Sequence, residues 1–103
     1  MNEFILCAAN YYNDGKEYIH NPVNIKIGYI ICGRRHHNCI QTFAQIYGFP
    51  YSKEANIIQQ TEIEGFLTSK NRFLNREEAY RVAFAAAQCD KKDNVRLYSE
   101  DLY

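Results

Sequence analysis

The chain has 103 residues, and its twelve Lys and Arg residues are balanced by twelve Asp and Glu residues. This length fits one domain, 1–103, and the zero net charge argues against a long electrostatic track for DNA. The sequence has no run of roughly 20 apolar residues that would span a membrane, and the apolar run at 4–9 is too short for a signal peptide. We therefore expect a cytoplasmic protein with neither DNA nor membrane as a partner, and with four cysteines that are free thiols.

Three stretches of the sequence have strand character. The apolar run at 4–9 precedes the turn signal Asn13-Asp14-Gly15. The run VNIKIGYIIC at 23–32 alternates apolar and polar side chains over its first residues, which is typical of a strand with one buried face. Residues 63–68 are predicted to form a further strand and 69–74 a polar loop, whereas 51–64 is ambiguous and is treated as a connector with short elements.

Two stretches have the period of an amphipathic helix. The first is predicted at 39–47, with Asn38 as N-cap and Gly48 as the stop. The second is predicted at 76–88, with Asn75 as N-cap and Glu78 completing a capping box. Small residues on the second helix would allow close approach of either the sheet or a second copy of the helix. The expected fold class is α+β, a small antiparallel sheet with two amphipathic helices in a helix-mediated homo-oligomer.

A cationic cluster occupies the first strand-to-helix junction, where GRRHHN at 33–38 contains Arg34, Arg35, His36 and His37. The first turn of a helix has unpaired N–H groups and a positive dipole end, and arginine forks match phosphate oxygens. These residues therefore suggest a phosphate site. The alternative is that one arginine pairs with a surface carboxylate while the histidines merely pack.

A second basic junction lies in GFLTSKNRFLNREEA at 65–79. Arg72, Arg76, Phe66 and Phe73 surround a polar loop that again leads into a helix. Arginines bind phosphates and aromatic faces stack on bases, so the composition suits a nucleotide, although either phenylalanine could instead belong to the core. Together the two junctions suggest two walls of one nucleotide pocket.

Catalytic and metal chemistry have weaker support in the sequence. The adjacent histidines could act as general acid and base in phosphodiester cleavage, but no nucleophile with an evident partner lies near them. The spacing of His36 and Cys39 is not specific for a metal. We expect no catalytic residue, no metal and no cofactor, and hence not an enzyme.

Several motifs in order resemble a known family. These are Gly33 with Arg35 and His36, the stretch GFLTSKNRFLNREEA, the alanine-rich helix ending in Gln88, and the terminal LYSEDLY. In this order they resemble the phage Thoeris anti-defense (Tad) sponge family, first type. The resemblance implies sequestration of glycocyclic ADP-ribose, a cyclic ADP-ribose isomer, without cleavage. Thoeris effector activation in the cytoplasm of the infected bacterial host would thereby be blocked.

The resemblance also implies partners and pocket residues. Members form homodimers that assemble further, so a hexamer is one expected state, and some members also bind cyclic oligonucleotides. The positions that match the family motifs are Arg35, His36, Phe66, Asn71, Arg72 and Arg76. On chemical grounds alone, Arg34, His37 and Phe73 are added to the ligand-binding set.

Two other function classes compete with this reading. The first is a phosphodiesterase that degrades a cyclic nucleotide signal with His36 or His37. The second is a direct protein inhibitor of a host defence effector, acting through a tyrosine-rich surface, because tyrosine is enriched at protein interfaces.

Overall fold

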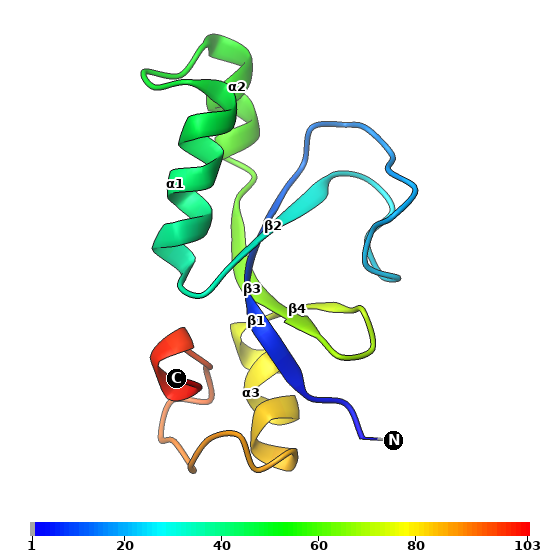
Figure 1. The fold of residues 1–103 in the computed structure, drawn as a ribbon, viewed down its shortest axis with the longest axis vertical. Helices are drawn as coiled ribbons and strands as arrows, with labels where there is room; N and C mark the ends of the chain where they lie inside the picture. Colours follow the sequence, from blue (N-terminus) through cyan, green and yellow to red (C-terminus); the bar gives the residue numbers. More distant parts are fainter. Residues whose placement is uncertain (1) are drawn as a thin grey trace.

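The computed structural model describes residues 2–103 and has an α+β fold (Figure 1). Four strands, β1, β2, β3 and β4, form one antiparallel sheet in the order β2-β1-β3-β4, accompanied by three α-helices and one short 3-10 helix. In chain order the elements are β1 Ile5–Tyr12, β2 Tyr29–Gly33, α1 His36–Tyr47, α2 Lys53–Gln59, β3 Ile63–Thr68, β4 Phe73–Asn75, α3 Arg76–Ala85 and η1 Ser99–Asp101. The predicted α+β class with a small antiparallel sheet is confirmed, with one more α-helix than the two predicted. Among the described residues, no helix has both the length and the apolar character to cross a membrane.

The central strand β1 sets which side chains face the helices. Its pairing with β3 shifts from Ile5–Thr68 to Cys7–Leu67, so Leu6 is the extra residue of a bulge. The extra residue brings Ile5 onto the same face as Ala8, and both lie in the core. Leu6 is left 48 % exposed on the opposite face of the sheet.

Two hydrophobic clusters form the core on the helix face of the sheet. One joins β1, β3 and β4 to α3, and it includes Leu97, which brings the C-terminal segment back to the body. The other packs α1 against β1 and β2 through Tyr12, Ile31 and Phe43, with Tyr12 and Phe43 stacked 4.3 Å apart. The small residues Ala79 and Ala83 of α3 lie in the first cluster, so this helix uses them to approach the sheet.

The predicted strand at 23–32 is largely wrong. Only Tyr29–Gly33 is strand, because residues 13–28 cross the sheet as an irregular loop. The side chain of Asn24 binds both backbone groups of Phe73 in β4, and the N–H of Val23 binds the Asn71 carbonyl at 2.8 Å. These bonds hold the alternating residues beside β4 instead of in a ladder, and Val23 is 73 % exposed.

Other element boundaries differ by a few residues. Helix α1 begins at His36, so Arg35 takes the N-cap position and Asn38 lies at N3, where its side chain accepts the Arg35 N–H at 3.0 Å. Helix α2 and strand β4 fall within the segments expected to be connector and loop. The strand at 63–68 and the capping box of Asn75 and Glu78 are confirmed.

Helix α3 ends at Ala85, three residues before the predicted end. Ala87 has a positive φ of 59°, and the N–H of Gln88 bonds to the Ala83 carbonyl at 2.8 Å, which closes the helix. The Gln88 side chain then binds the N–H and the carbonyl of Ile5, at 2.7 and 2.8 Å. Gln88 thus pairs with the start of β1 instead of extending the helix.

Candidate functional site

Arg34 and Arg35 lie in the two-residue connection between β2 and α1. The C-terminal segment folds back over them, and the Tyr103 ring contacts both guanidinium groups, with centroid distances of 5.4 and 5.3 Å. Nη2 of Arg35 also donates a hydrogen bond to the Tyr103 carbonyl. The ring therefore holds two arginine side chains beside each other at the N-terminus of α1.

Arg76, the first residue of α3, connects four parts of the chain. Its Nη1 donates to the Leu97 carbonyl at 2.9 Å, and its Nη2 forms an ion pair with Glu64 of β3 at 2.7 Å. Its guanidinium lies over the ring of Tyr98 at 4.7 Å. Because only 12 % of the Arg76 side chain is exposed, its guanidinium mainly makes contacts within the protein.

His36 is buried beneath Arg76. One ring nitrogen, Nε2, lies 2.8 Å from the Gly65 carbonyl, which can only accept, so Nε2 carries the proton. The other, Nδ1, then accepts from Nη2 of Arg76 at 3.3 Å. Burial, with a smaller effect from the Arg76 charge, lowers the pKa of His36 below its ordinary value of 6.5. Both nitrogens of this neutral ring are therefore occupied within the fold.

The four residues Arg34, Arg35, Arg76 and His36 are the part of the predicted site that the structure brings together. With Tyr98 and Tyr103 they form what we call the arginine–tyrosine cluster. Sequence reasoning missed the two tyrosines, which both come from the terminal LYSEDLY. No local pattern in the sequence marks these two tyrosines as site residues. They flank the single turn of η1, which places both rings against the rest of the protein.

Two features leave positive charge in the cluster without an acceptor. Among residues 2–103, the buried side-chain atoms without a hydrogen-bond partner are Nη1 of Arg35 and Oδ1 of Asn10. Helix α1 has no acidic residue in its first turn, whereas α3 has Glu77 and Glu78 in the same place. The positive end of the α1 dipole is thus not neutralised by the helix itself.

Besides Glu64, a second carboxylate stands close to these charges. The pKa of the exposed Glu100 side chain is lowered, mainly by a backbone hydrogen bond and also by the positive charge of Arg35. Glu100 is therefore ionised near the cluster at neutral pH. An anionic ligand would have to bind in its presence.

His37 is exposed at the second position of α1, away from the buried ring of His36. Cys39 is fully buried in the core, and burial raises the pKa of its thiol to about 11. Within the described part of the chain, no group of three His, Cys, Asp or Glu side chains is arranged to hold a metal ion.

The two predicted phenylalanines have different positions in the fold. Phe66 is fully buried, and its ring packs against the edge of His36 with the centroids 5.0 Å apart. Phe73 faces the other side of the sheet, 7 % exposed, with its centroid 6.1 Å from that of Tyr11. Both rings belong to packed layers, so the core alternative describes them better than an open stacking face.

Asn71 and Arg72 lie in the turn between β3 and β4, away from the cluster. Arg72 forms a two-point contact with Glu3, at 2.8 and 2.7 Å, and Thr68 donates to the same carboxylate at 2.5 Å. Because Thr68 and Glu64 are at opposite ends of β3, about 13 Å separates this turn from the surroundings of Arg76. The two junctions therefore meet through Arg76 but not through Arg72.

The chain was compared with known families, curated proteins and solved structures. The model of the phage T4 y16D protein family matches residues 4–103. No curated protein and no solved structure gives a significant match. Since the match covers almost all of the chain, including both basic junctions and the tail that covers Arg35, the protein belongs to the phage T4 y16D protein family.

Proposed function

We propose that this phage protein is a non-catalytic sponge that binds and sequesters a cyclic ADP-ribose-type immune messenger in the cytoplasm of the infected host. The observation that supports it most directly is Arg35, whose Nη1 is buried without an acceptor while Arg34 lies on the same tyrosine ring. A phosphate oxygen would supply the missing acceptor. Glycocyclic ADP-ribose is the ligand implied by the resemblance to the Thoeris anti-defense sponges.

The ligand chemistry matches the composition of the arginine–tyrosine cluster. Cyclic ADP-ribose isomers carry two phosphates and one purine, and arginine forks beside tyrosine rings bind these groups. Charge-assisted hydrogen bonds contribute roughly 1.5–3 kcal/mol each, so phosphate contacts with Arg34, Arg35 and the α1 N-terminus provide the larger share. Arg76 and His36 would support Arg35 from below.

The assembly of subunits is part of the proposal. The cluster lies at the surface, and Arg34 and Tyr103 are both exposed. Nanomolar affinity needs about −12 kcal/mol net, and burial of the ligand between two subunits would help to reach it. We therefore propose a homodimer, able to assemble further, that covers the ligand. Cyclic oligonucleotides are the second ligand class to test.

The phosphodiesterase alternative has less support from the geometry. Both ring nitrogens of His36 are engaged within the fold, so only His37 remains free of the two histidines predicted to act in cleavage. General acid–base cleavage of a phosphodiester needs two positioned groups. Binding without turnover needs neither.

The test is a calorimetric titration with a panel of cyclic ADP-ribose isomers and cyclic oligonucleotides, followed by heat denaturation and chromatography of the released ligand. We expect stoichiometric binding, intact ligand, and a loss of affinity of about tenfold or more in Arg35→Ala, with Arg81→Ala as the exposed control. Recovery of a hydrolysed product would establish the phosphodiesterase instead. Absence of binding, together with a stable complex with a host effector in nucleotide-free buffer, would establish the inhibitor.

A further inference from the structure

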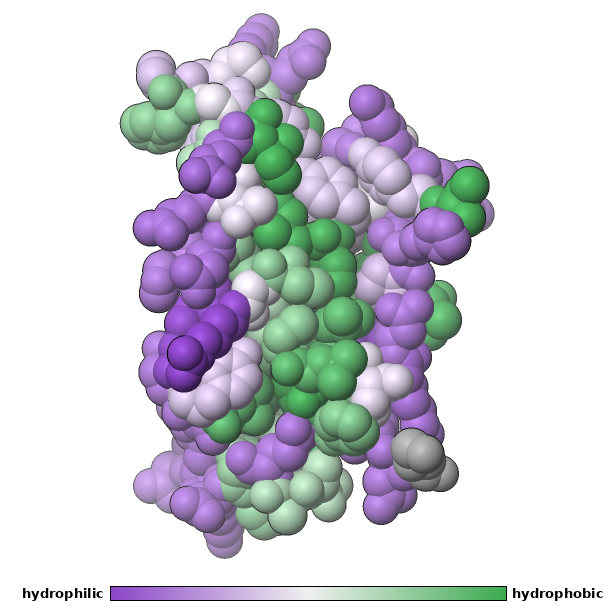
Figure 2. Space-filling model, viewed as in Figure 1, coloured by the Kyte–Doolittle hydropathy of each residue, from purple (hydrophilic) through white to green (hydrophobic). Residues whose placement is uncertain are grey.

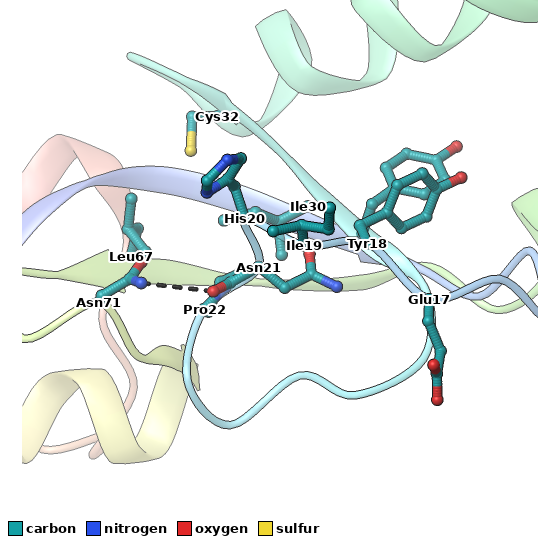
Figure 3. Close-up of a pocket in the computed structure, with 11 residues that line it drawn as sticks. Glu17, Tyr18, Ile19, His20, Asn21, Pro22, Ile30, Cys32, Leu67 and Asn71 are labelled. Atoms are coloured by element: carbon teal, nitrogen blue, oxygen red, sulfur yellow. Dashed lines mark hydrogen bonds between the residues drawn. The ribbon is translucent and has the colours of Figure 1, made fainter.

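A hollow of about 670 Å³ lies on the face of the sheet that the helices leave uncovered (Figure 3). Its floor is apolar and consists of Ile30 and Cys32 of β2 and Leu67 of β3. The irregular segment 17–22 forms one wall, and Asn71 stands at the edge. Figure 2 shows that apolar side chains gather over the middle of the molecule in the view of Figure 1, with hydrophilic residues along both sides.

The wall of the hollow is held in place by hydrogen bonds. The side chain of Asn21 donates to the Gly28 carbonyl at 2.9 Å, and the Asn71 side chain donates to the Asn21 carbonyl at 3.3 Å (Figure 3). Gly28 permits the close approach that this requires, because a Cβ there would lie 2.4 Å from the Tyr12 carbonyl oxygen. The hollow is thus a feature of the folded loop, although Ile19 of the same loop stays 94 % exposed.

Aromatic rings close one end of the hollow. Tyr18 and Tyr29 pack edge to face with their centroids 5.9 Å apart. Their hydroxyl groups are directed elsewhere, to Asp14 and, at 2.5 Å, to Tyr47. The Tyr29 ring packs on the helix face beside Tyr12, so Tyr18 is the ring that presents its carbon atoms to the hollow, which favours a planar apolar ligand.

Polar groups that can still form hydrogen bonds surround this apolar floor. The His20 ring lies beside Cys32 in Figure 3 and takes part in no hydrogen bond among residues 2–103. The amides of Asn21 and Asn71 donate through Nδ2, and their Oδ1 atoms accept no hydrogen bond from the described chain. An apolar floor with a few hydrogen-bonding groups at its rim is the usual composition of a small-molecule site.

From this arrangement we propose that the hollow binds a nucleobase, with the sugar directed toward Arg34. Cys32 in the floor precedes Arg34, the first residue after β2, by two residues, so at most about 7 Å of chain separates them. One sugar spans this distance between a base and a phosphate. The choice of a nucleotide over other planar ligands rests on the proposed function, while the hollow itself rests on its lining.

The experiment uses adenosine and ribose 5-phosphate as separate probes, added to the full-length ¹⁵N-labelled protein and followed by NMR. We expect adenosine to shift the resonances of 17–22, Ile30 and Cys32, and ribose 5-phosphate to shift those of Arg34 and Arg35. Cys32→Trp, which fills the floor from an exposed position, should weaken adenosine binding about tenfold or more, against less than about twofold for Leu6→Trp on the same face.

The possible results separate this inference from the proposed function. If adenosine shifts the hollow but no cyclic ADP-ribose isomer binds, the hollow is a base site and the sponge proposal is wrong. If adenosine leaves 17–22 and Cys32 unshifted at millimolar concentration, or shifts another region, the inference is overturned even where a cyclic ADP-ribose isomer binds at Arg35. Should Cys32→Trp unfold, the exposed His20→Ala decides in its place, because unchanged adenosine affinity there would count against the hollow.

Discussion

Replacement of Arg76 tests whether this arginine supports the fold or touches a ligand. Arg76→Ala removes a hydrogen bond to the Leu97 carbonyl, an ion pair with Glu64, a contact with the Tyr98 ring and a long hydrogen bond to Nδ1 of His36. A charge-assisted hydrogen bond contributes roughly 1.5–3 kcal/mol, the cation–π contact about 1 kcal/mol, and the ion pair little, since Glu64 is 35 % exposed and water can solvate it. The free energy of unfolding should fall by about 3 kcal/mol, which for a domain of this size lowers Tm by about 12–24 °C.

The assay is urea and thermal unfolding followed by circular dichroism, with Arg81→Ala as the control on the same helix. Arg81 is exposed and should cost less than about 0.5 kcal/mol. Arg76→Lys, which keeps the charge but not the two-pronged geometry, should recover roughly half of the loss. The reasoning fails if Arg76→Ala is within about 1 kcal/mol of Arg81→Ala. Such a result, combined with a loss of ligand affinity, would show that Arg76 contacts the ligand directly.

Three further perturbations have expected outcomes. The pKa of His36 is lowered in the folded state, so protonation of its ring opposes folding, and the free energy of unfolding should fall as the pH drops below 6.5. Urea unfolding at pH 5 and 7.5 should show this dependence in the parent protein and not in His36→Gln. The pKa of Glu3 is lowered to about 2, mainly by its hydrogen bonds with Arg72. The pair should therefore add about 1 kcal/mol to the free energy of unfolding above pH 4.5, and this contribution should be lost as the pH falls toward 2. Glu3→Gln should show no such loss. Asn75→Ala removes the cap of α3 and should cost about 1 kcal/mol, measured against the exposed Asn56→Ala.

Local signals in the sequence predict those elements whose determinants are also local. The box of Asn75 and Glu78 and the strand at 63–68 depend on neighbours within a few residues, and both are found as expected. The alternation at 23–32 is equally local, but Val23 and Asn24 make their hydrogen bonds to Asn71 and to Phe73 of β4, about 50 positions later. A hydrogen bond from a side chain to the backbone of a distant strand cannot be predicted from the alternation of apolar and polar residues.

Prediction of the candidate site is limited in the same way. The sequence marks Arg34, Arg35 and Arg76 as cations at helix starts, but it does not show which of them is already paired. Pairing depends on Glu64 and on the tyrosines of the tail, which approach only after β3 and the C-terminal segment are in place. Phe66 and Phe73 look alike in sequence, yet the sheet places them on opposite faces, and both become buried.

Arg34 and Arg35 differ from the ion-paired cations of the chain, and this difference favours the N-terminus of α1 as the anion site. In the described residues, ion pairs join Arg72 to Glu3, Arg76 to Glu64 and Lys92 to Asp101. Arg34 and Arg35 take part in no such pair, but both are ordered by the Tyr103 ring. Holding a long side chain in one position costs roughly 0.5–1.5 kcal/mol on binding, and stacking meets part of that cost before a ligand arrives. A neutral chain can therefore present two oriented positive charges at one helix terminus, which is what selective binding of a small, doubly charged anion requires.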